Sequence, residues 1–444
     1  MHNTLRKTSN PIFLTAALLM LFTIAGTATA EKLTLEQSIN IALENNPSIH
    51  IAKENTHKAD ALVRQALSAG YPKVTVNATY RRLDKSTTAN FGGQTVVLNK
   101  ADNRSADLNV SHNVDLFGTV KAGRSAARAG KSAYQYYLDA QINDTTLDVK
   151  NAFYNVLRAQ QNQQVQSETV AQLDAHLKDA QANFDAGTIA KYDVLRAETE
   201  VANSKQRFIS AKNGVDLAKA ALNTVMGSPV STEIELEEPA RKPYVIIDLA
   251  NAVDTASKSR PEVLAAADMI KVDDEFTAIA KKSLLPSLNA QWTLNHNFDT
   301  SAFNSRKESW VALLTARMSI FDGGYNKANI DIAKSNANTL RFTKDQIVLG
   351  VTLEAQQSYL SLNESQERIN AAETALVQAN EAYRLAIVRY KSGVSTQLEV
   401  LDTETALTAA KLNLVNALYD YQVALAKLER AVGGSDQMAT LTAK

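Results

Sequence analysis

The spacing of proline constrains the fold of this chain more than any other feature. Beyond residue 30, prolines stand at Pro47, Pro72, Pro229, Pro239, Pro243, Pro261 and Pro286. Two spans of nearly equal length, 73–228 and 287–444, contain none. Because proline lacks an amide donor and clashes within a helix, these spans can hold long helices or regular strands. The proline-rich and acidic region 228–245 between them is interpreted as a connector.

The two halves of the chain repeat each other. Pro47 and Pro72 recur as Pro261 and Pro286 at one constant offset, and Gly187 recurs as Gly393 at a slightly smaller one. Landmarks that recur in the same order at a similar spacing indicate an internal duplication. The expected units are a first repeat 31–227, the connector 228–245, a second repeat 246–432 and a tail 433–444.

Residues 1–30 fit a secretory signal peptide. Two basic residues precede an apolar run at 12–25, and Ala28-Thr29-Ala30 gives the small-x-small cleavage pattern. We expect the mature chain to begin at Glu31, and the alternative is an uncleaved anchor. No later stretch approaches 18 consecutive apolar residues.

Composition excludes several classes of protein. The chain has 47 basic and 47 acidic residues, which is not the balance of a nucleic-acid binder. The mean hydropathy of −0.22 argues against a bundle of membrane-spanning helices. No cysteine is present, so disulfides and thiolate chemistry are excluded. No phosphate loop, His-Glu-x-x-His motif or nucleophile elbow occurs, so we expect no enzyme and no cofactor.

A seven-residue period follows each of the two glycines. After Gly187 one heptad position holds Val194, Val201, Phe208, Val215 and Leu222, and alanine is frequent three residues later. The same pattern follows Gly393. A heptad keeps one stripe of a helix facing a partner, so we expect two long helical hairpins with turns near 187 and 393. A soluble structural coiled coil gives the same pattern.

A two-residue period marks two β-hairpins, about 73–118 and 287–321. Val74, Val76 and Ala78 alternate with polar residues, and three aromatic residues are candidates for a membrane–water boundary: Tyr80, Trp292 and Trp310. Such segments are typical of transmembrane barrels, although a water-soluble sheet with one buried face is the alternative. Four strands cannot close a barrel, so several chains must each contribute four.

The motifs together resemble the TolC-like outer membrane efflux proteins. The resemblance rests on Leu-Phe-Gly at 116–118, FDAGTIAKYDVL at 184–195 and SGVSTQLEVLD at 392–402, and it covers almost the whole mature chain. It implies a mainly α fold with a transmembrane β part. In that fold a homotrimer forms a 12-stranded barrel in outer-membrane lipid, continued by a long α-helical barrel in the periplasm.

The resemblance also implies a function and its partners. Members of the family form the exit duct of efflux or type I secretion systems, docked to a periplasmic adaptor and an inner-membrane pump. The connector and the C-terminal tail would form a collar around the waist, and no nucleic acid is involved. An exported coiled coil or adhesin without a pore is the alternative, and single-channel conductance distinguishes the two.

The resemblance places the family's gate residues near the two tip glycines. The acidic constriction falls on Glu399 and Asp402, although Glu399 could instead form a capping box with Thr396. A latch hydrogen bond would join Tyr390 to Asp193, and seam packing is the alternative for Tyr390. The family's basic latch residue falls on Ser395, which is not basic. The adaptor would contact four tip residues: Gly187, Thr188, Gly393 and Val394.

Overall fold

The computed structural model describes residues 32–239, 244–301 and 305–442. The signal peptide predicted at 1–30 lies outside them.

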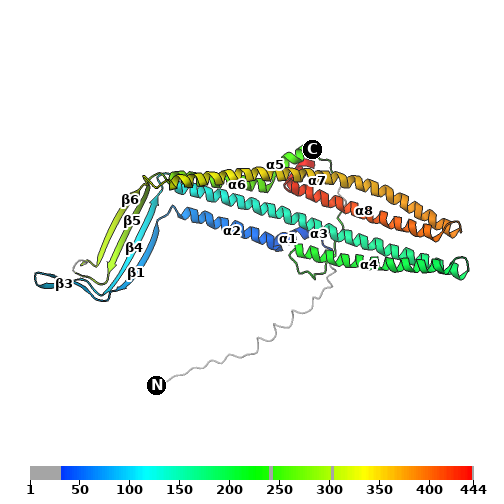
Figure 1. Cartoon of the computed structure of the whole chain (residues 1–444), viewed down its shortest axis with the longest axis horizontal. Coiled ribbons are helices and arrows are strands. Elements are labelled where there is room, and N and C mark those ends of the chain that lie inside the picture. The colour runs from blue at the N-terminus through cyan, green and yellow to red at the C-terminus, as the bar shows by residue number, and fades with distance from the viewer. Residues whose placement is uncertain (1–31, 240–243, 302–304, 443–444) are drawn as a thin grey trace, which may run out of the picture.

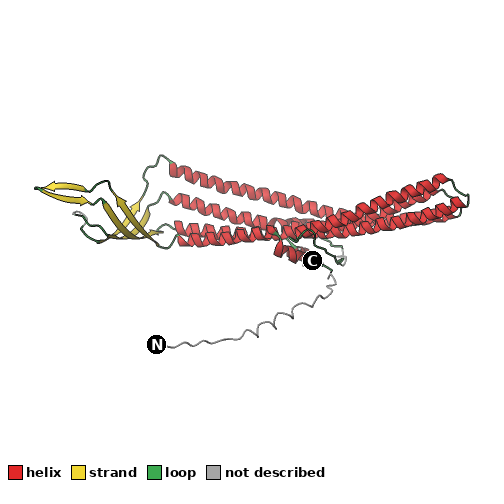
Figure 2. Ribbon diagram, turned by 90° about the horizontal axis from the view of Figure 1, so that it is seen from below, coloured by secondary structure: helices red, strands yellow, loops and turns green. Residues whose placement is uncertain are grey.

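The protein is elongated, with a β-sheet at one end, the turns of two helical hairpins at the other, and small helices around the waist (Figures 1 and 2). The helices are α1 (Leu35–Asn45), α2 (Pro47–Ser68), α3 (Thr119–Asp185), α4 (Lys191–Val225), α5 (Leu249–Ser259), α6 (Pro261–Lys282), α7 (Tyr325–Lys391), α8 (Gln397–Ala431) and α9 (Ser435–Thr442). The strands are β1 (Lys73–Arg82), β2 (Thr87–Phe91), β3 (Gln94–Asn99), β4 (Asp102–Val114), β5 (Ser287–Asn297) and β6 (Glu308–Arg317).

Helix lengths confirm the internal duplication. Helices α1 and α5 both have 11 residues, and α2 and α6 both have 22. Helices α3 and α7 both have 67, and α4 and α8 both have 35. Each repeat therefore consists of one unbroken long helix and shorter helices that pack beside it.

The shorter helices meet end to end at the waist, where α3 and α7 continue without a break. The turn after α4 places Gly227 against Asn45, so closely that an added Cβ would lie 2.6 Å from the Asn45 carbonyl oxygen. The turn after α8 similarly places Gly433 against Ser259. Both glycines have positive φ, which other residues rarely adopt. The backbone geometry at these junctions therefore requires glycine.

The four-stranded sheet has the order β1-β4-β5-β6, and every neighbouring pair is antiparallel. The register aligns Val76, Leu108, Leu294 and Trp310 in one row, which makes one face of the sheet apolar. On the other face, Asn109 donates a hydrogen bond to Thr293 at 2.9 Å. Strands β1 and β6 remain as unpaired edges of the sheet within the chain.

The two-stranded sheet of β2 and β3 was not predicted from the sequence. This small hairpin lies between β1 and β4, and it extends away from the main sheet (Figure 1). Gly92 and Gly93 form its turn, both with positive φ, which suits a two-residue hairpin loop. The Gly-Gly pair between two β-prone runs was the available signal.

The heptad positions form much of the helical core. In α4 Val194, Val201, Val215 and Leu222 are buried, whereas Phe208 is only half-buried. Helix α3 packs along α4, α6 and α8, and therefore connects the two repeats. In the described part of the chain no helix is long and apolar enough to cross a bilayer.

Two arginines at the waist join four helices through ion pairs. Arg430 of α8 lies 2.7 Å from Asp144 of α3, 2.6 Å from Glu354 of α7 and 3.0 Å from Glu262 of α6. Arg260, whose side chain is 3% exposed, contacts the same two glutamates. Burial alone would lower the pKa of Arg430, but the surrounding carboxylates outweigh it and raise that pKa. The arginine therefore stays charged, and it is held by three carboxylates.

We predict that Arg430→Ala destabilises the protein by about 2 kcal/mol or more, because three partly buried carboxylates lose their cation. Thermal unfolding followed by circular dichroism measures the change. Arg384→Ala is the matched control, since Arg384 forms an exposed pair with Glu381 within α7 and its loss should leave the thermal midpoint nearly unchanged. Equal losses in the two variants would contradict the proposed importance of the waist network.

Candidate functional site

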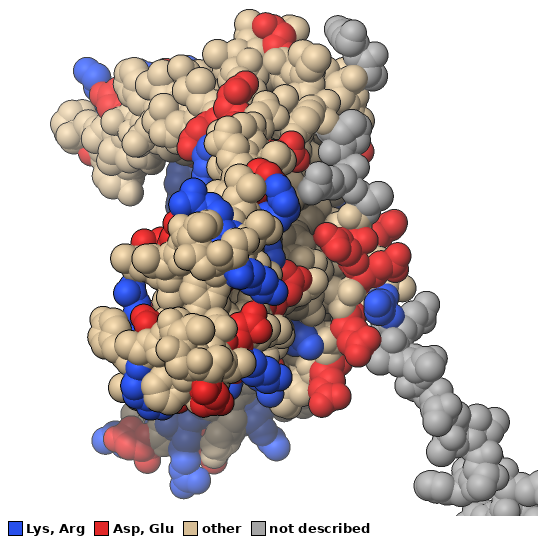
Figure 3. Space-filling view, turned by 90° about the vertical axis from the view of Figure 1, so that its right-hand side faces the viewer, with Lys and Arg blue, Asp and Glu red and all other residues tan. Residues whose placement is uncertain are grey.

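The two hairpin turns lie together at the end of the molecule farthest from the sheet, where acidic and basic side chains are interspersed (Figure 3). Gly187 and Gly393 have φ of 76° and 74°. At each turn the residue after the glycine donates its amide to a carbonyl five residues earlier, as Thr188 does to Asn183 and Val394 does to Arg389. These turns are closed by the backbone, and Val394 remains exposed.

Glu399 bonds within its own hairpin. Its carboxylate accepts a hydrogen bond of 2.6 Å from the Ser395 hydroxyl and lies 3.4 Å from Arg389. The alternative capping box is wrong, because Thr396 makes no side-chain capping hydrogen bond at the start of α8. Ser395 therefore orients the acid three residues before Asp402. Asp402 is exposed on α8.

The expected hydrogen bond between Tyr390 and Asp193 is not formed. The Tyr390 hydroxyl is buried and has no hydrogen-bond partner among the described residues. Its ring lies against His176 of α3, with ring centroids 5.3 Å apart. Asp193, in the first turn of α4, is half-buried. Tyr390 therefore packs across to α3, and its hydroxyl does not reach the acid of α4.

Three charged or polar residues near the tips were missed by sequence reasoning. His176 contacts Tyr390, Asp179 lies 3.8 Å from Lys391, and Arg389 approaches Glu399. Helical periodicity could place each of them on a face of its own helix. It could not identify the partners of His176 and Asp179, which lie in another helix more than 200 residues away, because that depends on how the two hairpins are rotated against each other.

A buried acid lies farther from the tips, between α3 and α8. Glu404 is 4% exposed and accepts a hydrogen bond of 2.8 Å from Thr408, whose hydroxyl lies 2.8 Å from that of Thr169. Burial raises the pKa of Glu404, and the hydrogen bond from Thr408 and the charge of Arg207 only partly oppose it. The interface between the hairpins thus contains an acid whose ionisation is disfavoured by burial.

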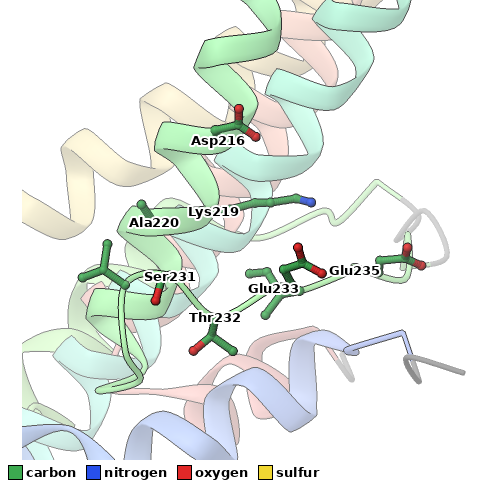
Figure 4. A pocket seen from close by; sticks show the side chains of 9 residues that line it. Asp216, Lys219, Ala220, Ser231, Thr232, Glu233 and Glu235 are labelled. Carbon is green, nitrogen blue, oxygen red and sulfur yellow. The ribbon is translucent and has the colours of Figure 1, made fainter. Parts of the chain in front are cut away.

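The connector packs against α4 at the waist. It pairs with the N-terminal segment through the Leu33 amide and the Glu235 carbonyl, 2.8 Å apart. An open groove of about 450 Å³ separates it from α4, with Asp216 and Lys219 on the helix and Glu233 on the connector (Figure 4). The connector therefore adds an acidic surface to the outside of the waist.

The three aromatic residues of the sheet occupy different heights. Trp310 lies near the start of β6, and Tyr80, near the end of β1, donates a hydrogen bond to Asp102 at 2.7 Å. Trp292 lies at the middle of β5, opposite Val110 and Ala312. Trp310 lies opposite Leu294, two residues along β5 from Trp292, so the two tryptophans occupy adjacent rows of the apolar face, and Tyr80 lies farther toward one end of the sheet.

Comparison with known proteins identifies one family. The family model described as outer membrane efflux protein matches residues 38–228 and 252–434, one match in each repeat. The chain is 25% identical to outer membrane protein OprJ of Pseudomonas aeruginosa over 90% of this chain and 84% of that protein. It is 23% identical to TolC of Vibrio cholerae, covering 95% and 94%. The open-state MtrE channel of Neisseria gonorrhoeae superposes with a TM-score of 0.76 at 22% identity, covering 90% and 89%, which shows the same fold.

We predict that Glu404→Gln stabilises the protein at pH 7.5. The pKa of Glu404 is raised in the folded state. The protonated side chain therefore stabilises the folded state fully at pH values below the ordinary pKa of 4.5, and this contribution to stability is lost as the pH rises through the folded-state pKa. The variant's advantage in thermal midpoint should therefore disappear near pH 4.5. Glu364→Gln, at an exposed position of α7, is the control and should show no such dependence. An advantage that is the same at both pH values would contradict the assignment.

Proposed function

Because the chain belongs to the outer membrane efflux protein family, we propose that it is the passive exit duct of a tripartite efflux or type I secretion system. It is an outer-membrane protein whose helices form the periplasmic part. Its relatives are channels, and we propose no catalytic role for it. The observation that carries the proposal is that the family match covers both repeats of a chain with the channel fold.

The open sheet supports a trimer. Its two edge strands, β1 and β6, have unpaired backbone groups, and Val76 and Trp310 on its apolar face are exposed. Such edges cannot face lipid, because their amide and carbonyl groups would lack partners. Three copies joined edge to edge would pair every strand in a closed cylinder of twelve, with Tyr80, Trp292 and Trp310 as its candidate boundary residues.

The hairpin tips support a gate and a docking surface. Glu399 and Asp402 would line the narrowest part of the duct, with Tyr390 and Asp193 nearby on neighbouring helices. Gly187, Thr188, Gly393 and Val394 would contact a periplasmic adaptor, which links the duct to an inner-membrane pump. The relative MtrE has been described in an open state, so a gate that opens has a structural precedent.

Planar-bilayer recordings test the proposed duct. Protein purified from outer-membrane fractions should migrate as a trimer after chemical cross-linking and should produce discrete single-channel currents. A heat-denatured sample is the control and should produce none. Recovery of a monomer without currents would support the alternative of an exported coiled coil or adhesin.

We predict that Glu399→Ala with Asp402→Ala reduces cation selectivity and block by multivalent cations, because each chain then loses two carboxylates from the duct. Reversal potentials in a salt gradient measure the selectivity. Glu364→Ala with Glu367→Ala removes the same charge from exposed positions of α7 and should leave selectivity unchanged. Unchanged selectivity in the Glu399→Ala, Asp402→Ala variant would mean that Glu399 only stabilises the hairpin turn and does not line the duct.

A further inference from the structure

An open cavity of about 700 Å³ lies where the sheet meets the helices (Figure 1). It is bounded by the end of β4, the start of β5 and the end of β6, and by the start of α3 and the end of α6. None of the residues assigned to the gate, to the hairpin tips or to the aromatic boundary lines it. The proposed duct therefore leaves this cavity without a role.

The charged side chains of the cavity leave it with a positive charge. Arg317 at the end of β6 and Lys282 at the end of α6 line it, together with one acid, Asp115, between β4 and α3. Asp115 is already engaged, because it accepts a hydrogen bond of 3.1 Å from the Lys121 amide at the start of α3. Two basic groups against one acid give the lining a net charge of +1. A ligand with one negative charge would balance it.

Both basic groups have donors available for such a ligand. The Lys282 Nζ atom donates one hydrogen bond of 2.8 Å to the Gly118 carbonyl, which leaves its other protons available. Arg317 is exposed, and within the described residues its guanidinium takes part in no ion pair or hydrogen bond. Asn289, which donates to Asn113 at 2.7 Å, adds carboxamide groups to the lining. Lysine, arginine and amide donors together suit a phosphate group.

Much of the remaining wall is apolar and continues the apolar face of the sheet. Val114 and Leu288 line the cavity and lie opposite each other in the register, on the face that carries Trp292. Leu116 and Phe117 follow Val114 and are 59% and 43% exposed. Exposed apolar side chains beside basic groups indicate an amphiphilic ligand, with a charged head and an apolar tail.

The height of the cavity along the molecule points to a membrane lipid. The chain is an outer-membrane protein whose helices form the periplasmic part. Helix α3 begins and helix α6 ends at the cavity, and the apolar face of the sheet starts directly beside it. The cavity therefore lies at the level where the headgroups of the periplasmic leaflet meet water.

We propose that the cavity binds one phospholipid of the periplasmic leaflet, with its phosphate between Arg317 and Lys282 and its acyl chains along Leu116 and Phe117. A phosphodiester carries one negative charge, which matches the net charge of the lining. The inference goes beyond the proposed duct, because it requires only that the sheet lies in the membrane. Since the lining joins β6 to α3 and α6, a bound lipid would stabilise the junction between the sheet and the helices.

Native mass spectrometry of the full chain purified in detergent tests the proposal. The probe is palmitoyl-oleoyl-phosphatidylglycerol, and the diacylglycerol with the same acyl chains is the uncharged comparison. One phosphatidylglycerol per chain should remain bound, whereas diacylglycerol and inorganic phosphate should not. Diacylglycerol bound as tightly as phosphatidylglycerol would overturn the role of the phosphate. Inorganic phosphate bound as tightly would show a site for a free anion and would overturn the lipid.

Substitutions in the lining identify the groups that bind. Arg317→Gln with Lys282→Gln should weaken phosphatidylglycerol binding about ten-fold or more, because two charge-assisted hydrogen bonds are lost. Arg317→Lys keeps the charge and should retain most of the affinity. Leu116→Asp places a negative charge beside the phosphate at an exposed position, so it should also weaken binding while leaving the bond between Lys282 and Gly118 intact. Circular dichroism checks that each variant keeps its helices and strands.

Lys73→Gln is the matched control. Lys73 is exposed at the start of β1, at the same end of the sheet, but it does not line the cavity. Its loss should leave the affinity nearly unchanged. Equal weakening by Lys73→Gln and Arg317→Gln, or undiminished binding in the variant that lacks both Arg317 and Lys282, would overturn the lipid site. Because binding is measured without channel currents, its failure is distinct from a failure of the proposed duct.

Discussion

The ion pairs of Arg430 and Arg260 are the interaction on which the arrangement of the helices depends. Long helices with alanine-rich interfaces can slide or rotate along each other, because small side chains interlock weakly. At the waist one guanidinium contacts carboxylates from α3, α6 and α7 at the same time. Since guanidinium–carboxylate bonds are directional, they fix both the axial position and the rotation of these helices. The distant hairpin turns consequently meet at a defined height.

The same helices have different packing partners on either side of the waist. Toward the sheet, α3 packs along α2 and α6, whereas toward the tips it packs along α4 and α8. Apolar clusters and nearly buried ion pairs such as Lys150–Glu429 are concentrated at and near the waist. The tips have small and polar contacts. The largest apolar clusters therefore lie near the waist, and a smaller one lies closer to the tips.

Much of the fold could be predicted from the sequence because its signals are local or periodic. Proline spacing and recurring glycines revealed the duplication, and alternation revealed the strands that carry Val76 and Leu294. The β2–β3 hairpin was missed because its Gly-Gly turn lies inside a connection that was treated as a loop. The site was less predictable. Glycine turns at 187 and 393 follow from backbone geometry, but the partner of Tyr390 depends on packing between distant helices, which no single-helix pattern encodes.

The end-to-end junctions at Gly227 and Gly433 have a mechanical consequence. In each repeat one long helix runs unbroken through the waist, whereas the helices beside it meet end to end there. A load along the molecule therefore passes through α3 and α7, and the end-to-end junctions transmit compression but little bending moment. Bending stiffness at the waist is therefore supplied by α3 and α7, which cross it unbroken, and by the apolar clusters packed against them.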